Sequence, residues 1–337
     1  MTVRKCLYAG VGLACSLTIG LSSDGAKKSK SASAAEAAAS EPAVMWHDPG
    51  DISSRDLFDG PGGPGHEPHG MFHFEKEDLD GTNPKFVVKD QDGVKWKVKL
   101  GIEARPETVA SRFLWAVGYY ANEDYFVSDL QVKGMPEHLH RGQNMIEADG
   151  SVHNVRLKRE DEKKIGIWSW RDDPFSGTRE LNGLRTLMAV MNNWDLKDVN
   201  NAIYDIGGRR IFTVSDLGAS FGCPDRCWPK DKSKGDLEEY GRSEFIRKAT
   251  PETVSFETPA RPAYPYAVNP KEYLSRIHLE WIGRDIPRAD AKWMGSLLAR
   301  LSPQQIHDAF RAAGYPTDEI DGFSKVLEGR IKQLNDL

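Results

Sequence analysis

Residues 94–100 alternate strictly between apolar and charged side chains, and this pattern limits what the chain can fold into. One parity holds Val94, Trp96, Val98 and Leu100, and the other holds Lys95, Lys97 and Lys99. Successive residues of a β-strand point to opposite faces of a sheet, so the segment is predicted to be a strand with one apolar face and one lysine face. The apolar face requires a core on that side of the sheet.

Two further alternating segments precede this strand, at Met71–Glu77 and Phe86–Lys89. The residues between the three segments, Asp80–Lys85 and Asp90–Gly93, are rich in the residue types that favour turns. Residues 71–100 are therefore predicted to form a three-stranded antiparallel meander.

A helix over Glu107–Gly118 is expected after the meander, because Pro106 precedes it and apolar residues recur at helical spacing. Further strands are expected at residues 125–132, 152–158 and 165–170. The first half of the chain is thus predicted to be β-rich with one embedded helix.

The second half has a helical pattern. Thr178–Asn192 carries an apolar stripe, with Thr178 as the expected N-cap. Ser302–Gln305 matches a capping box with proline in the first turn, and further helices are expected around residues 293–301 and 320–334. The predicted fold is α+β, with a β-rich lobe over 46–171 and a mainly helical lobe over 172–337. A cleft between two lobes is a common place for a ligand.

The N-terminus predicts export. Arg4 and Lys5 precede an apolar segment at residues 7–21, and small residues follow, so residues 1–26 are interpreted as a signal peptide. An uncleaved anchor helix is one alternative. A lipoprotein signal is another, because residues 12–15 resemble an imperfect lipobox that would make Cys15 the lipid anchor. Residues 27–45 are rich in Ala, Ser, Lys and Glu, which predicts a disordered linker. The expected location is periplasmic or extracellular.

The net charge limits the expected classes of binding partner, and the cysteine content indicates a disulfide. The 337 residues carry a formal net charge of −5, which argues against nucleic-acid binding. No apolar segment of the mature chain reaches the length of a membrane span. Outside the leader the cysteines are Cys223 and Cys227, and in an oxidising compartment they are predicted to form a disulfide.

Two segments in the second half have the residues for phosphate chemistry. Asp195 is followed five residues later by Asn200, and Asp216 ends an apolar segment and is followed by Leu217 and Gly218. A carboxylate can accept a proton from an attacking hydroxyl, while an amide oxygen and a second carboxylate can bind the divalent cations that bridge phosphates. The structural alternative is capping or a turn for each aspartate.

These two segments resemble the protein-kinase superfamily. The family pattern is H-R-D-L-x-x-x-N followed by a strand ending in D-F-G, and this chain has N-W-D-L-K-D-V-N and then V-S-D-L-G. The resemblance implies Asp195 as the base, Asn200 and Asp216 as metal ligands, and Lys197 as a contact of the transferred phosphate. Asn193 and Trp194 in place of His-Arg, and the absence of G-x-G-x-x-G, depart from ordinary protein kinases.

The N-terminal half extends the resemblance to the atypical branch of the superfamily. Gly81-Thr82-Asn83-Pro84-Lys85 is similar to the G-x-Q-P-K phosphate loop of HipA-type kinases, and an ordinary hairpin loop is the alternative. Lys99 resembles the lysine that binds the α- and β-phosphates, with Lys97 as the second candidate. Glu107 resembles its glutamate partner, with Glu103 as the second candidate. The atypical branch also includes phosphoinositide-kinase-like and secretory-pathway-kinase-like proteins.

The resemblance implies an exported phosphotransferase, or a related nucleotidyl transferase, that uses ATP and Mg²⁺ or Mn²⁺. Proteins, lipids and small molecules are all candidate acceptors for the phosphoryl group. The alternative is a kinase-fold pseudoenzyme that acts as a nucleotide-binding or protein-binding module in the cell envelope. A structural envelope protein is the third interpretation.

Overall fold

The computed structural model describes residues 42–222, 234–258, 270, 274 and 278–337. The described residues belong to one compact unit that begins at Pro42, and they have a mixed α+β structure. The predicted signal peptide, most of the predicted linker and the predicted Cys223–Cys227 disulfide lie outside the described residues.

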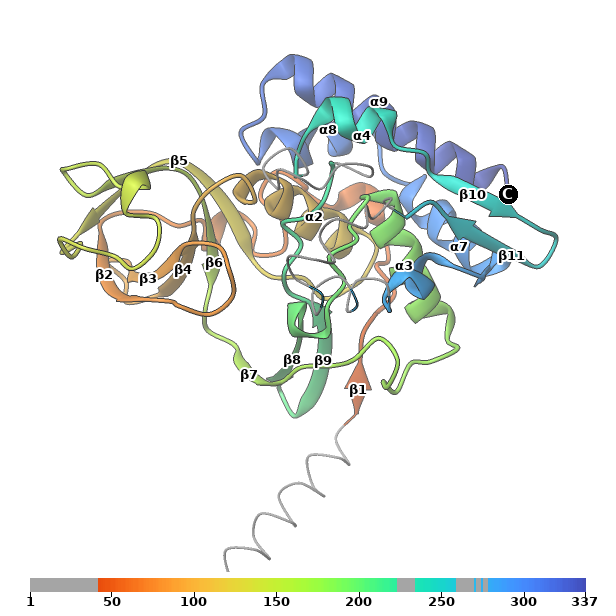
Figure 1. Ribbon diagram of the computed structural model, residues 1–337, viewed down its shortest axis with the longest axis horizontal. Coiled ribbons are helices and arrows are strands. Elements are labelled where there is room, and N and C mark those ends of the chain that lie inside the picture. The colour runs from red at the N-terminus through yellow and green to blue at the C-terminus, as the bar shows by residue number, and fades with distance from the viewer. Residues whose placement is uncertain (1–41, 223–233, 259–269, 271–273, 275–277) are drawn as a thin grey trace, which may run out of the picture. The chain divides into compact units, whose positions relative to one another are not determined.

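A closed five-stranded barrel forms from the predicted β-rich region (Figure 1). Its strands are β2 (Phe72–Glu77), β3 (Lys85–Lys89), β4 (Lys95–Lys99), β5 (Asp124–Lys133) and β6 (Ser151–Arg159), in the order β2-β3-β4-β6-β5. The antiparallel meander predicted for residues 71–100 is confirmed. Trp96, Val98 and Leu100 lie in the barrel's own apolar core, as the alternation requires.

The register of the barrel decides which cations meet outside that core. Lys99 of β4 lies opposite Lys85 on β3 and opposite Arg156 on β6. Directly opposed residues point to the same face of a sheet. Three cationic side chains are therefore brought side by side on one face of the barrel wall.

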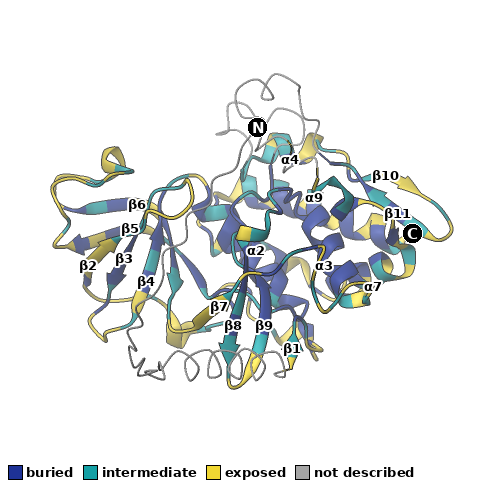
Figure 2. Ribbon diagram, turned by 60° about the horizontal axis from the view of Figure 1, so that its bottom comes forward, coloured by how far each residue is buried: buried dark blue, intermediate teal, exposed yellow. Residues whose placement is uncertain are grey.

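Helix α2 (Ala104–Ala116) is embedded between β4 and β5 in the chain, and it contacts β5 and β6. It begins three residues earlier than the sequence predicted, because Pro106 is accommodated within its first turn and does not precede it. Almost every residue of α2 is buried, which Figure 2 shows in its colouring.

A second sheet has the order β1-β9-β8-β7, from β1 (Ala43–Val44), β9 (Arg209–Val214), β8 (Asn201–Ile206) and β7 (Lys163–Gly166). The strand predicted at residues 165–170 is wrong beyond Gly166. The Trp168 indole N–H donates to the carbonyl of Thr213 at 2.9 Å, and Trp168 and Trp170 pack in the main core. Because both indole rings are buried in the main core, the chain leaves the sheet after Gly166.

This sheet joins segments from both sides of residue 171, since β1 and β7 pair with β9 and β8. The division into lobes at residue 171 stays a prediction.

The rest of the described chain is mainly helical. Its helices are α3 (Arg179–Val190), α4 (Leu237–Arg242), α7 (Arg288–Leu298), α8 (Pro303–Arg311) and α9 (Thr317–Asn335). A small sheet in this region contains β10 (Ile246–Ala249), β11 (Thr253–Phe256) and β12 (Ile286–Pro287). Short 3₁₀ turns lie along the whole described chain, at η1 (Ile52–Ser54), η2 (Pro64–His66), η3 (Gln143–Met145), η4 (Asp198–Asn200) and η6 (Glu280–Gly283). The N-cap predicted at Thr178 and the capping box of Ser302 with Gln305 are both confirmed.

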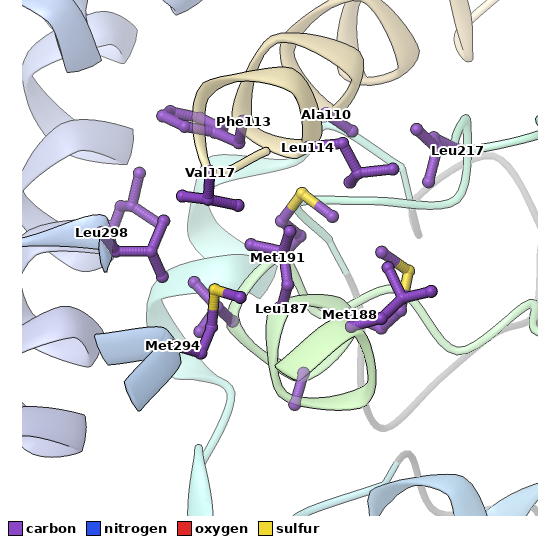
Figure 3. Packing of buried hydrophobic residues seen from close by; sticks show 14 of the residues in the cluster. Ala110, Phe113, Leu114, Val117, Leu187, Met188, Met191, Leu217, Met294 and Leu298 are labelled. Carbon is purple, nitrogen blue, oxygen red and sulfur yellow. The ribbon is translucent and has the colours of Figure 1, made fainter. Parts of the chain in front are cut away.

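One large apolar cluster joins α2 to these helices, and Figure 3 shows side chains of α2, α3 and α7 packed together. Leu217 belongs to the same cluster and is fully buried, so the residue after Asp216 anchors that loop to the core. Among the described residues, we find no helix with the length and apolar character that crossing a bilayer needs.

Two glycines in helices give a matched test of this packing. A Cβ added at Gly183 in α3 would lie 2.4 Å from a ring carbon of Trp293, whereas one added at Gly329 in α9 would meet nothing within 4 Å. Gly183→Ala should lower the free energy of unfolding by about 1–3 kcal/mol, because the clash exceeds the gain in helix propensity. Gly329→Ala should raise it by about 0.5–1 kcal/mol. Urea unfolding measures both, and equal effects would contradict the packing of α3.

Candidate functional site

The candidate site is centred on the buried ammonium of Lys99. Its Nζ lies 2.7 Å from Oε2 of Glu107, 3.0 Å from Oε2 of Glu103 and 3.0 Å from Oδ1 of Asp216. Lys99 and both glutamates are buried, while the side chain of Asp216 is 42% exposed. Burial alone would lower the pKa of Lys99, but the attraction of Glu107, Asp216 and Glu103 raises it.

The second candidate lysine lies elsewhere. Lys97 pairs with Asp78 and Glu160, each at 3.0 Å. Lys99 is therefore the lysine that reaches Asp216, and it contacts both of the glutamates that the sequence offered as partners.

A second cation holds Glu107 from the neighbouring strand. Nη2 of Arg156 lies 2.8 Å from Oε1 of Glu107, and its Nε lies 3.5 Å from Oδ1 of Asp124. Each carboxylate oxygen of Glu107 thus faces a different cation, and all of these groups are buried. Burial nevertheless raises the pKa of Glu107 above its usual value, against the attraction of Arg156 and Lys99. Arg156 and Asp124 were not singled out from the sequence, although Arg156 lies in a predicted strand between the apolar residues Val155 and Leu157.

The loop after β9 is fixed through Asn200. The backbone N–H groups of Ser215 and Asp216 both donate to the carbonyl of Asn200, at 2.8 and 3.1 Å. The N–H of Gly218 donates to Oδ1 of Asp216 at 3.4 Å. Burial would raise the pKa of Asp216, but the charge of Lys99 and its hydrogen bond hold that pKa well below the usual range.

Asp195 is tied to the same loop. Nδ2 of Asn200 donates to the carbonyl of Asp195 at 2.5 Å, and the N–H of Asp195 donates to Oδ1 of Asn193 at 3.2 Å. Asn193 in turn donates to the hydroxyl of Ser220 at 3.0 Å. Nζ of Lys197 lies 3.4 Å from Oδ1 of Asp195. Asn193, which departs from the family pattern, therefore links the Asp195 loop to the segment after Asp216.

The predicted phosphate loop joins the cluster through one residue. Nδ2 of Asn83 donates to Oε2 of Glu103 at 2.5 Å, while Gly81 and Thr82 are exposed. Gly81 has φ +66°, and its carbonyl accepts a hydrogen bond from Arg141. Burial lowers the pKa of Lys85, which lies opposite Lys99 in the sheet.

Glu103 also contacts Lys234, which lies 131 residues further along the chain. Nothing in the sequence around residue 234 indicates this contact. The carboxylate of Glu103 therefore accepts hydrogen bonds from Lys99, Asn83 and Lys234. Its side chain also packs against Gly218, where an added Cβ would lie 2.6 Å from the Cβ of Glu103.

The described cluster contains more acidic than basic groups. Three cations (Lys99, Arg156 and Lys234) face four carboxylates (Glu103, Glu107, Asp124 and Asp216). Glu103, Glu107 and Asp216 each bring one oxygen within 4.8 Å of the others. Carboxylate and amide oxygens are the ligands that Mg²⁺ prefers, so Asp216 and Asn200 could hold such an ion near the ammonium of Lys99.

No family of known proteins, no curated protein and no solved structure matches this chain. A function is therefore inferred from the chain's own residues.

The role of Lys99 in setting the charge of Asp216 is directly measurable. Lys99→Met should raise the pKa of Asp216 by at least about one pH unit, because the nearest opposite charge is removed. Lys97→Met is the matched control and should leave it unchanged, since Lys97 pairs with other carboxylates. Carboxyl ¹³C NMR titration measures both, and an unchanged pKa in Lys99→Met would contradict the ion pair.

The contribution of the buried Arg156 ion pairs to the free energy of unfolding can be measured. Arg156→Met should lower the free energy of unfolding by about 3–5 kcal/mol, because Glu107 and Asp124 lose a buried partner. Arg242 is exposed and pairs with Glu238 at 3.2 Å, so Arg242→Met should cost less than about 1 kcal/mol. Chemical denaturation at neutral pH compares the two, and similar losses would argue against the buried network.

Proposed function

We propose that this chain is an exported phosphotransferase with a bilobal protein-kinase-like fold, which uses ATP and Mg²⁺ or Mn²⁺. The observation that carries the proposal is the contact of one lysine ammonium with both Glu107 and Asp216. Protein kinases need a lysine on the third strand, a glutamate on the next helix and a metal-binding aspartate in one place. Lys99 ends the third barrel strand, and Glu107 is in the helix that follows it.

The order of the elements supports the same fold. The barrel has three antiparallel strands, then α2, then two more strands, and a helical region follows. The β8–β9 hairpin separates the Asp195 loop from the Asp216 loop, and Asn200 joins the two loops. A catalytic loop and a metal loop that both face one nucleotide would need such a connection, which supports the proposal.

The residues divide into roles by position. Asp216 and Asn200 would hold the divalent cation, which neutralises phosphate charge. Lys99, oriented by Glu107, would bind the α- and β-phosphates, and the turn at residues 81–85 would cover the phosphates. Asp195 would accept the proton as the acceptor hydroxyl attacks the γ-phosphorus. The bond to the ADP oxygen breaks, and ADP leaves. Lys197 is close enough to Asp195 to neutralise the transferred phosphoryl group.

Export rests on the leader at residues 1–26, with Cys15 as the alternative lipid anchor. The proposed cell location is therefore periplasmic or extracellular, and the acceptor is open.

A kinase-fold pseudoenzyme is the second candidate, and Glu103 favours it. Glu103 contacts Lys99, Asn83 and Lys234, so the cationic and loop groups that phosphates need already have a carboxylate partner. A nucleotide must displace this carboxylate or recruit it to the cation. A protein that binds nucleotide without transfer would fit such a closed arrangement.

Alanine substitutions of the two aspartates should abolish different steps of the reaction. Asp216→Ala should abolish metal-dependent ATP binding, because the phosphate charge then lacks its cation. Asp195→Ala should bind ATP with Mn²⁺ nearly as the wild type does and transfer nothing, because the base acts on the acceptor. At about 100 times Kd, bound nucleotide should stabilise the wild type by about 2.7 kcal/mol.

Thermal shift with ATP and Mn²⁺, together with γ-phosphate transfer to protein, lipid and small-molecule acceptors, measures both steps. Asp205→Asn on β8 is the matched control and should change neither. Wild type that binds ATP and transfers to no acceptor or water would favour the pseudoenzyme. Wild type that binds no nucleotide with any divalent cation would end the kinase-like proposal.

A further inference from the structure

A pocket of about 320 Å³ lies at the start of α3, and the described residues of its wall include two arginines and no acidic residue. The described residues that line it are Trp170, Arg171, Ser176, Gly177, Leu181, Asn182, Arg185 and Trp281. Three carboxylates near the pocket have other hydrogen-bond partners. Asp285, whose negative charge raises the pKa of Arg185 against the effect of burial, accepts from the hydroxyl of Ser255 at 3.3 Å. Asp290 accepts from Asn182 at 2.8 Å, and Asp198 accepts from the N–H of Trp170 at 3.3 Å.

Arg185 is the buried cation of this pocket. It is only 8% exposed, and it forms no ion pair with a carboxylate in the described part of the chain. Four of its five N–H groups donate to the carbonyls of Trp281, Ile282 and Arg284 and to Oδ1 of Asn182. Burial lowers the pKa of Arg185 to about 10. The negative charge of Asp285 opposes this effect only in part, so the guanidinium would gain from a further anion.

Arg171 supplies a second, accessible cation. Its guanidinium lies 5.2 Å from the ring centre of Trp281, the same distance as the guanidinium of Arg185. Its Nη2 donates to the carbonyl of His278 at 3.3 Å, and among the described residues it has no carboxylate partner. The indole N–H groups of Trp170 and Trp281 are also buried without a hydrogen-bond partner there. Residues of this wall therefore carry several N–H donors without an anionic partner in the described part of the chain.

We propose that this pocket binds the oxyanion group of a small organic anion, a phosphate or a carboxylate. Arg171 and the remaining N–H of Arg185 supply the charge, and the aromatic face of Trp281 with Leu181 holds the apolar part of the ligand. Guanidinium groups suit such a ligand because their planar N–H pairs match an oxyanion. This inference does not rest on the proposed kinase function.

None of the described residues that line the pocket belongs to the Lys99 cluster. Leu181, Asn182 and Arg185 lie in the first two turns of α3, whereas Asn193 and Asp195 follow the last turn. The Asp195 loop approaches the pocket through Asp198, which accepts a hydrogen bond from the N–H of Trp170 at 3.3 Å.

Calorimetric titration without divalent metal tests the pocket, with inorganic phosphate, phenyl phosphate and benzoate as probes. Wild type should bind at least phenyl phosphate saturably, and more tightly than inorganic phosphate because its ring contacts Trp281. Arg171→Gln should weaken this binding by about tenfold or more. Phosphate-selective binding or benzoate binding identifies which oxyanion the pocket prefers.

Two variants make the result specific. Arg179→Gln is the matched control, because Arg179 is exposed and stacks on Trp293 at 4.5 Å outside this pocket, and it should change affinity less than about twofold. Asp216→Ala, which removes a partly exposed side chain of the Lys99 cluster, should retain the binding. Absence of saturable binding by all three probes, equal affinity in Arg171→Gln and wild type, or loss of binding in folded Asp216→Ala would each overturn the proposal. Arg171 is on the surface, so Arg171→Gln should unfold at the wild-type denaturant midpoint.

Discussion

The ammonium of Lys99 is buried at the end of a barrel strand, and a charge in that position is stable only with partners. Removing such an ion from water costs several kcal/mol, so the carboxylates around it are a condition of the fold. They come from α2 and from the loop after β9, as Glu103, Glu107 and Asp216. One electrostatic requirement therefore joins three segments of the chain that span residues 99–216.

The position of α2 follows from the same requirement. Glu107 receives one cation from β4 and one from β6, and Lys99 and Arg156 are directly opposed in the sheet. Two adjacent strands thus hold both oxygens of one carboxylate, which fixes the rotation of α2 against the barrel. The barrel wall itself thus holds Glu107 toward Lys99.

Local sequence patterns predicted much of the barrel and of the helical region. The alternation at residues 94–100 placed Lys99 and Lys97 on the face away from the core, and the capping signals located α3 and α8. The choice between Lys99 and Lys97 depended on register with β6 and on the distance to Asp216, which no local pattern contains. Lys234 reaches Glu103 across 131 residues, so only the folded chain brings them together. The strand expected through Trp170 failed because burial of two indoles outweighed β-pairing.

The two arginine-containing environments show why burial and pairing have to be considered together. Arg156 is buried with carboxylates on both sides, and its pKa is raised because their attraction exceeds the effect of burial. Arg185 is buried with carbonyls and an amide as partners, and burial lowers its pKa. Hydrogen bonds to neutral acceptors satisfy the donors of this guanidinium, and the charge of Asp285 offsets the effect of burial only in part. The described acid cluster has four carboxylates and three cations, whereas the described wall of the pocket at the start of α3 has two arginines and no carboxylate. Because α3 begins at the pocket and leads into the Asp195 loop, one buried helix connects these two oppositely charged environments.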